Sequence, residues 1–185
     1  MALTKTPVCD FGKKAEDFKL KSIENKIISL NDVIGEKATL IMFICNHCPY
    51  VKAIIRDLAQ DCNELKKDGI NSIAIMSNDT ENYPEDSFDN MIKFAKDNNF
   101  KDLNYLIDET QDIAKKYGAV CTPDFFGYNK NLELQYRGRI RELKNLKPVR
   151  EGDSDLKVAM TMISKTQKGP IEQIPSMGCN IKWFK

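Results

Sequence analysis

A buried strand that runs directly into an amphipathic helix is the feature that most constrains the fold of this chain. Residues 40–44 (LIMFI) are consecutively apolar, which is typical of a strand buried on both faces. The spacing of the next apolar residues is helical, and one face is formed by Val51, Ile54, Ile55, Leu58, Cys62 and Leu65. Pro49 suits the first turn of that helix, where its missing N–H would have no partner. This junction predicts the centre of an α/β sheet.

The junction carries a CxxC pair, Cys45-Asn46-His47-Cys48. We expect both cysteines on one face of the first helical turn, close enough to form a disulfide. The helix N-terminus lowers the pKa of a nearby thiol because it stabilises the thiolate. The first cysteine of such a pair is expected to be the more exposed one, so Cys45 is the predicted nucleophile and Cys48 the resolving thiol. His47, the single histidine, is predicted to stabilise the Cys45 thiolate.

The rest of the chain alternates between strand and helix patterns. The expected strands are 17–20 and 26–30, which form an N-terminal hairpin, then 70–76, 103–107 and, within 119–138, the two arms of a second hairpin after Pro123. The expected helices are a short turn at 31–35, then 85–98, 111–117 and 154–165. Because strands alternate with helices and hairpin arms are antiparallel, we predict an α/β fold with a mixed central sheet flanked by helices.

Length and charge narrow the class of protein. A chain of 185 residues is expected to form a single domain over 1–185 that ends in a C-terminal tail, 169–185. The 28 basic and 27 acidic residues nearly cancel, which disfavours a nucleic-acid partner. The first 21 residues lack the apolar core of a signal peptide, and no apolar run reaches the length of a membrane span. We therefore expect a cytoplasmic protein without a membrane partner.

Two cysteines outside the CxxC pair are candidate accessory thiols. Cys121 lies two residues before a proline, and Cys179 lies in the tail, where it either resolves a sulfenic acid or packs. One alternative is a zinc site formed by these two residues with Cys45 and Cys48. The second pair lacks CxxC spacing, so we predict no metal site. We also expect no cofactor, because electrons can travel through cysteines alone.

Two separate blocks resemble the thioredoxin-like superfamily. One is the strand–CxxC–helix block, and the other is Tyr117-Gly118 followed by Thr122-Pro123. The resemblance implies a cis peptide bond before Pro123, which would face the CxxC pair, and a Thr122 backbone that binds substrate. The N-terminal hairpin and an inserted strand–helix unit resemble the peroxiredoxin-like branch, which includes the alkyl hydroperoxide reductase/thiol-specific antioxidant group. Four further stretches resemble sequences of the same branch: FICNHCPYVKA, SND…YPEDS, CTPDFFGYN and PSMGCNIKW.

Departures from these relatives bear on the predicted activity. Ile44 stands where thioredoxin has a tryptophan. Residues 40–44 contain no Asp or Glu, so the buried acid that assists proton transfer in thioredoxin is not visible. Peroxiredoxins typically have Thr or Ser three residues before the peroxidatic cysteine. Here Cys45 stands there, which would make Cys48 the peroxidatic position. The arginine that peroxiredoxins carry near the start of a later strand has no clear match here, because Thr122-Pro123 occupies that region.

The predicted function is therefore an enzyme, a thiol–disulfide oxidoreductase with a reversible Cys45–Cys48 disulfide. Its partners would be a disulfide-containing protein or a small thiol or peroxide substrate, and an upstream thiol reductant. A peroxiredoxin-like antioxidant, acting as a thiol-dependent hydroperoxide peroxidase, is the first alternative. A metal-binding module and a non-catalytic interaction module are the others.

Overall fold

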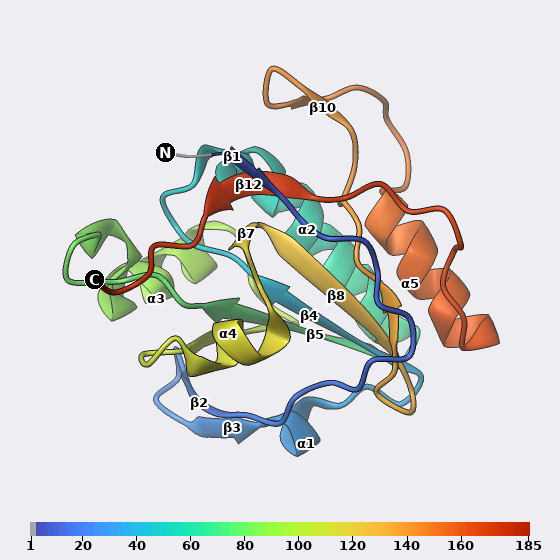
Figure 1. Cartoon of the computed structure of the whole chain (residues 1–185), viewed down its shortest axis with the longest axis horizontal. Helices are drawn as coiled ribbons and strands as arrows, with labels where there is room; N and C mark the ends of the chain where they lie inside the picture. Colours follow the sequence, from blue (N-terminus) through green and yellow to red (C-terminus); the bar gives the residue numbers. More distant parts are fainter. Residues whose placement is uncertain (1–2) are drawn as a thin grey trace.

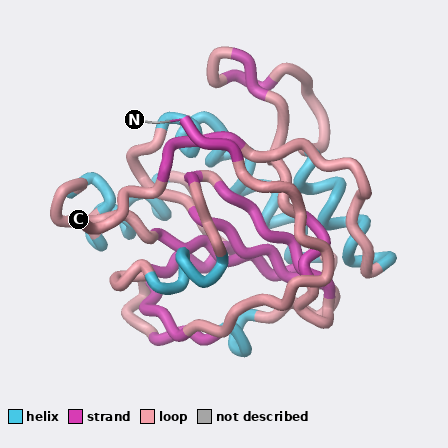
Figure 2. Tube along the Cα trace, viewed as in Figure 1, coloured by secondary structure: helices cyan, strands magenta, loops and turns pink. Residues whose placement is uncertain are grey.

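The central element of the fold is a mixed β-sheet, seen in a computed structural model that describes residues 3–185 (Figures 1 and 2). Seven strands pair in the order β3-β2-β6-β5-β4-β8-β9. Their bounds are β2 Lys19–Ser22, β3 Ile27–Ser29, β4 Ala38–Phe43, β5 Ile70–Met76, β6 Leu103–Ile107, β8 Asp124–Asn129 and β9 Leu134–Tyr136. β4 pairs in parallel with β5 and antiparallel with β8. The predicted mixed α/β fold is confirmed, as is the N-terminal hairpin of β2 and β3.

Helices cover both faces of this sheet. Their bounds are α1 Leu30–Val33, α2 Pro49–Lys67, α3 Phe88–Asp97, α4 Asp112–Tyr117 and α5 Asp155–Thr166. Side chains of β4 alternate between two apolar clusters, because successive residues of a strand point to opposite faces. Leu40 and Met42 join α2, α3 and α5, whereas Ile41 and Phe43 join α1 and α4. The sheet is thus buried on both faces at its centre.

A helix predicted at 85–98 is interrupted at Ser87. The structure has a short 3₁₀ turn, η1 (Pro84–Asp86), followed by α3. The Ser87 side chain caps α3 by accepting a hydrogen bond from the Asn90 backbone N–H. This break leaves Asp86 in the turn instead of on a helix, at the edge of the sheet where β4 and β5 end.

A second, smaller sheet contains β1 (Leu3–Lys5), β12 (Met177–Asn180) and β7 (Cys121–Thr122), with β12 in the middle. Figure 1 shows β12 in red beside β1, near the end of β7. Both pairings are antiparallel, and Cys179 lies opposite Leu3 on one side and Thr122 on the other. The sequence predicted no strand in the tail 169–185. The predicted hairpin after Pro123 is formed by β8 and β9, whereas β7, just before it, pairs with β12.

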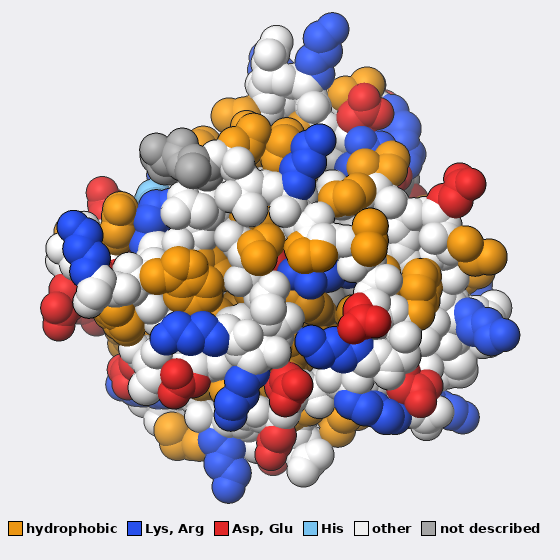
Figure 3. All heavy atoms as spheres, viewed as in Figure 1, with side chains coloured by type: hydrophobic (Ala, Val, Ile, Leu, Met, Phe, Trp, Pro, Cys, Tyr) orange, Lys and Arg blue, Asp and Glu red, His pale blue; other side chains and the backbone are white. Residues whose placement is uncertain are grey.

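The chain between the central hairpin and α5 forms a projecting arm (Figure 1). It contains a small hairpin of β10 (Leu143–Lys144) and β11 (Lys147–Pro148). Basic, acidic and hydrophobic side chains are interspersed on the face shown in Figure 3. Within residues 3–185, none of the helices has the length and apolar character needed to cross a membrane.

Candidate active site

Cys48 marks the N-terminus of α2. It is the N-cap residue, with φ −63° and ψ 124°, and the helix begins at Pro49. The expectation that Cys45 and Cys48 share the first helical turn was therefore wrong. The physical reason is Pro49, because a proline disfavours helical geometry in the residue before it. Cys45 instead lies in the loop after β4, which ends at Phe43.

The two thiols are equally buried, and their pKa values shift in opposite directions. Cys45 is 1% exposed and Cys48 is 0% exposed, so the predicted exposure of Cys45 is not observed. The pKa of Cys48 is lowered, chiefly by a hydrogen bond from the Cys45 thiol and further by Cys179 and the Val51 backbone N–H. The same contact and burial raise the pKa of Cys45. These directions favour Cys48 over Cys45 as the more acidic thiol of the pair.

The Thr122–Pro123 segment faces both cysteines, as the resemblance implied. Its peptide bond is cis. Thr122 Oγ1 lies 3.3 Å from Cys45 Sγ, and the Thr122 carbonyl oxygen lies 3.2 Å from Cys48 Sγ. The implied role of Thr122 in pairing with a substrate backbone fits less well. Its strand already pairs with β12 through Cys179, and Thr122 is only 3% exposed.

Pro123, which faces the two thiols, also borders a pocket. A pocket of about 510 Å³ is lined by Pro123 together with Tyr50 and Ile54 of α2, Met177 of β12 and several residues of the arm. Arg141 contributes to the same pocket. The pocket gives a substrate a place beside the Thr-Pro segment that β12 does not occupy.

Of the two candidate accessory thiols, one joins the CxxC pair and the other does not. Cys179 Sγ lies 3.0 Å from Cys48 Sγ, within hydrogen-bond distance for sulfur. Cys121 Sγ instead donates to the Pro123 carbonyl oxygen at 3.5 Å. Burial raises the pKa of the Cys121 thiol. The structure thus assembles a cluster of three thiols, Cys45, Cys48 and Cys179, which we call the three-thiol cluster.

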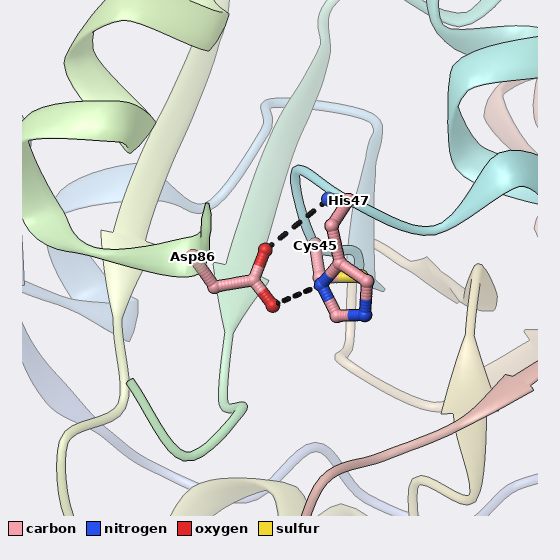
Figure 4. A group of neighbouring side chains, drawn as sticks. All are labelled: Cys45, His47 and Asp86. Carbon is pink, nitrogen blue, oxygen red and sulfur yellow. Dashed lines mark hydrogen bonds and ion pairs between the residues drawn. The ribbon is translucent and has the colours of Figure 1, made fainter. Parts of the chain in front are cut away.

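His47 is held by a buried carboxylate (Figure 4). Its Nδ1 lies 2.6 Å from Asp86 Oδ2. Asp86 Oδ1 accepts the backbone N–H groups of Asn46 at 2.8 Å and His47 at 3.2 Å, and Oδ2 also accepts Asn78 Nδ2 at 2.8 Å. The hydrogen bond that His47 donates to Asp86 raises the pKa of His47, because the carboxylate stabilises the protonated ring. The imidazole is therefore oriented by Asp86, and its positive charge lies close to the cysteines.

Asp86 is the site residue that the sequence reasoning missed. It is 0% exposed and fixes the backbone of the CxxC loop as well as the histidine ring. Two signals could have found it. A histidine in a redox site needs an orienting partner, and the loop after β5 reaches the same sheet edge as the loop after β4, because parallel strands end together.

Cys45, His47 and Asp86 also form, within residues 3–185, the one group of three possible metal ligands, with donor atoms all within 4.8 Å. Both Asp86 oxygens and His47 Nδ1 are already engaged in hydrogen bonds. A metal would have to break this network. The four-cysteine zinc alternative does not form, because Cys121 points to the Pro123 carbonyl.

Comparison with known families identifies the chain. Residues 11–143 match the model of the AhpC/TSA family. This protein belongs to the AhpC/TSA family. A comparison with curated proteins found no match.

Solved structures agree with this assignment. An uncharacterized conserved protein from Geobacillus kaustophilus is 37% identical, with a TM-score of 0.94 over 100% of this chain and 97% of that one. A hypothetical protein from Sinorhizobium meliloti is 33% identical, with a TM-score of 0.90 over 98% of each chain. A secreted disulfide oxidoreductase from Mycobacterium tuberculosis is 16% identical, with a TM-score of 0.54 over 64% of this chain and 80% of that one. This last likeness shows a shared thioredoxin-like fold.

Proposed function

We propose that this AhpC/TSA family protein is a thiol–disulfide oxidoreductase that cycles Cys45 and Cys48 between dithiol and disulfide. The observation that carries the proposal is a CxxC pair at the N-terminus of α2 whose two thiols both contact Thr122 beside the cis-Pro123, with the pKa of Cys48 lowered. Such a site provides a thiolate and an adjacent resolving thiol at neutral pH. A structural neighbour titled as a disulfide oxidoreductase supports the same chemistry.

The reaction follows from the order of the two pKa values. The Cys48 thiolate attacks one sulfur of a substrate disulfide, forms a mixed disulfide and expels the other sulfur as a thiolate, which takes up a proton. Cys45 then attacks Cys48 Sγ after losing its proton, and the second substrate sulfur leaves as a thiol. The substrate gains two electrons and two protons, and Cys45–Cys48 becomes a disulfide. An upstream thiol reductant restores the dithiol.

Three neighbouring residues have supporting roles in this proposal. His47, when protonated, places positive charge close to the thiolate and raises its population. Thr122 Oγ1 contacts Cys45 Sγ and holds it in the loop. Pro123 borders the pocket through which we propose that a disulfide-containing protein or a small thiol or peroxide approaches. The cytoplasmic location stays a prediction.

A thiol peroxidase is the second candidate, favoured by the position of Cys48 directly before Pro49 at a helix N-terminus. The thiolate would attack a hydroperoxide oxygen, release an alcohol or water and become a sulfenic acid. Cys45 would then condense with it, lose water and form the same disulfide. The lack of a clear match to the peroxiredoxin arginine weighs against this candidate, and Arg137, which follows β9, is paired with the buried Asp124 at 3.0 Å.

A rapid-mixing experiment separates the two candidates. The fully reduced protein is mixed with hydrogen peroxide or with oxidised glutathione, and the products are mapped by mass spectrometry. We expect fast reaction with the disulfide, slow reaction with peroxide and a Cys45–Cys48 bridge. Cys9→Ser is the control for loss of an unrelated thiol. Faster reaction with peroxide, through a sulfenic acid on Cys48, would instead assign the protein as a peroxidase.

A further inference from the structure

The C-terminal strand β12 brings a third sulfur to the reacting pair. We infer that Cys179 is a second resolving thiol, which forms a Cys48–Cys179 disulfide in competition with Cys45. This inference rests on the proposed function, because it takes Cys48 as the attacking thiolate. It gives a catalytic task to the tail 169–185.

The distance between the sulfurs is already short. Cys48 Sγ and Cys179 Sγ lie 3.0 Å apart, and a disulfide joins sulfurs about 2.05 Å apart. Bond formation therefore requires an approach of roughly 1 Å, which side-chain rotation and small backbone shifts provide. Cys45 and Cys48 both contact Thr122, which lies opposite Cys179 in the neighbouring strand, so both resolving candidates are gathered around the same residue.

The position of Cys179 is built into the fold. β12 is held by β1 on one side and by β7 on the other, with Cys179 opposite Thr122. Gly178 allows this approach, because a Cβ there would lie 2.0 Å from the Thr122 carbonyl oxygen. Ser176 Oγ donates to the Pro123 carbonyl oxygen at 2.8 Å and fixes the start of the strand. The tail is thus anchored to the Thr-Pro segment that faces the CxxC pair.

The pKa shifts of the three thiols fit a role for Cys48 as the sulfur that both disulfides share. Burial, followed by the contact with Cys48, raises the pKa of Cys179, and the pKa of Cys45 is also raised. Cys48 Sγ donates to Cys179 Sγ in the reduced protein, so the two sulfurs already share a proton. In either disulfide, Cys48 is the better leaving group, because the thiol of lower pKa leaves faster. A reductant that attacks the outer sulfur therefore regenerates the Cys48 thiolate.

The steps balance as ordinary thiol–disulfide exchange. Cys48 and a substrate sulfur are first joined in the mixed disulfide. Cys179, as a thiolate, attacks Cys48 Sγ, so the Cys48–Cys179 bond forms and the Cys48–substrate bond breaks. The departing substrate thiolate takes the proton that Cys179 lost. Attack of Cys45 on Cys48 Sγ later moves the disulfide to Cys45–Cys48 and releases Cys179, without any net change in oxidation state.

The test compares Cys45→Ser with Cys45→Ser/Cys179→Ser. Each reduced protein is mixed with oxidised glutathione, alkylated and mapped by mass spectrometry, and circular dichroism checks that each variant is folded. We expect the single variant to release glutathione and form Cys48–Cys179. The double variant should stall as a Cys48–glutathione mixed disulfide and release glutathione at least tenfold more slowly. The same double comparison with Cys9→Ser in place of Cys179→Ser is the matched control, and it should not stall.

The outcomes separate the inference from the proposed function. If the Cys45→Ser variant stalls with glutathione bound to Cys48 while Cys179 remains free to be alkylated, the inference is overturned. The proposed Cys45–Cys48 cycle then still stands. If the wild-type protein forms Cys45–Cys48 but Cys48 of Cys45→Ser does not react, Cys45 is the attacking thiol and the inference also falls. If no disulfide forms at Cys48 even in the wild type, the proposed function fails together with the inference.

Discussion

At the scale of single residues, Asp86 decides how the CxxC loop and its histidine are arranged. Its carboxylate accepts four hydrogen bonds while fully buried. A buried acceptor of this kind is expensive to disturb, because its donors are left without partners. Asp86 acts on the thiols through Asn46 and His47, so it is a positioning residue, as the site geometry indicates.

Asp86→Asn is predicted to lower the free energy of unfolding of the reduced protein by about 1–3 kcal/mol. The loss should be larger at pH 5.5 than at pH 9. The pKa of His47 is raised by Asp86, so the ion pair contributes fully below the ordinary value of 6.5 and its contribution disappears as pH rises through the folded-state pKa. Urea unfolding across this pH range measures the effect.

Glu85→Gln is the matched control, because Glu85 is exposed and contacts the loop through its backbone carbonyl. It should change the free energy of unfolding by less than about 0.5 kcal/mol at any pH. A loss in Asp86→Asn that is equal at both ends of the pH range would contradict a charged His47 paired with Asp86.

At the scale of elements, the long and strongly patterned segments were predictable, and the short ones were not. Strands 70–76 and 103–107 were predicted with the bounds that the structure shows. Phe125 and Phe126 of β8 enter opposite clusters, as the alternation of a strand requires. β12 has four residues and β7 has two, so neither is long enough to show the alternating apolar pattern that identifies a strand. Their pairing depends on contacts between distant parts of the chain, which a local pattern does not record.

In the candidate site, too, some features could be predicted from the sequence and others could not. The CxxC pair and Thr122-Pro123 could be located because their residue types carry chemistry. The placement of the two cysteines relative to the helix could not, since Pro49 moved the start of the helix to follow Cys48. Cys179 was known as a candidate, but only the sheet order places it beside Cys48.

Gly178→Ala is predicted to disrupt β12, because the added Cβ would overlap the Thr122 carbonyl oxygen at 2.0 Å and lie 3.0 Å from Pro123 Cδ. We expect a loss of about 1–3 kcal/mol in the free energy of unfolding, as for other overpacked positions. We also expect faster alkylation of Cys48 and Cys179 by iodoacetamide. Met177→Ala, which changes a partly exposed side chain of the same strand, is the control. Unchanged alkylation rates in Gly178→Ala would show that β12 does not shield the thiols.

At the scale of the whole molecule, the chemistry of Cys48 is coupled to the stability of the fold. The three-thiol cluster lies where α2 and the two sheets meet, so ionisation of Cys48 is stabilised only in the folded protein. A stabilised thiolate favours the reduced form and makes the disulfide a better oxidant. The redox state and the global free energy of unfolding must therefore change together.

The reduced protein is predicted to gain stability relative to the oxidised protein as pH rises. The pKa of Cys48 is lowered from its ordinary value of 9.0, so the thiolate contribution is full above that value and is lost as pH falls through the folded-state pKa. In the Cys45–Cys48 disulfide this titration is absent, whereas the His47 contribution is common to both forms. Urea unfolding of both forms from pH 5 to pH 9 should give a difference that widens with pH, and reduced Cys48→Ser should lack the rise. A difference in the free energy of unfolding that does not depend on pH would contradict a Cys48 thiolate stabilised by the fold.

The same stabilisation of the Cys48 thiolate predicts a reduction potential of the Cys45–Cys48 disulfide above about −270 mV, the value of thioredoxin. Equilibration of the protein with a glutathione buffer measures this potential. A potential at or below the thioredoxin value would contradict a thiolate stabilised by the fold.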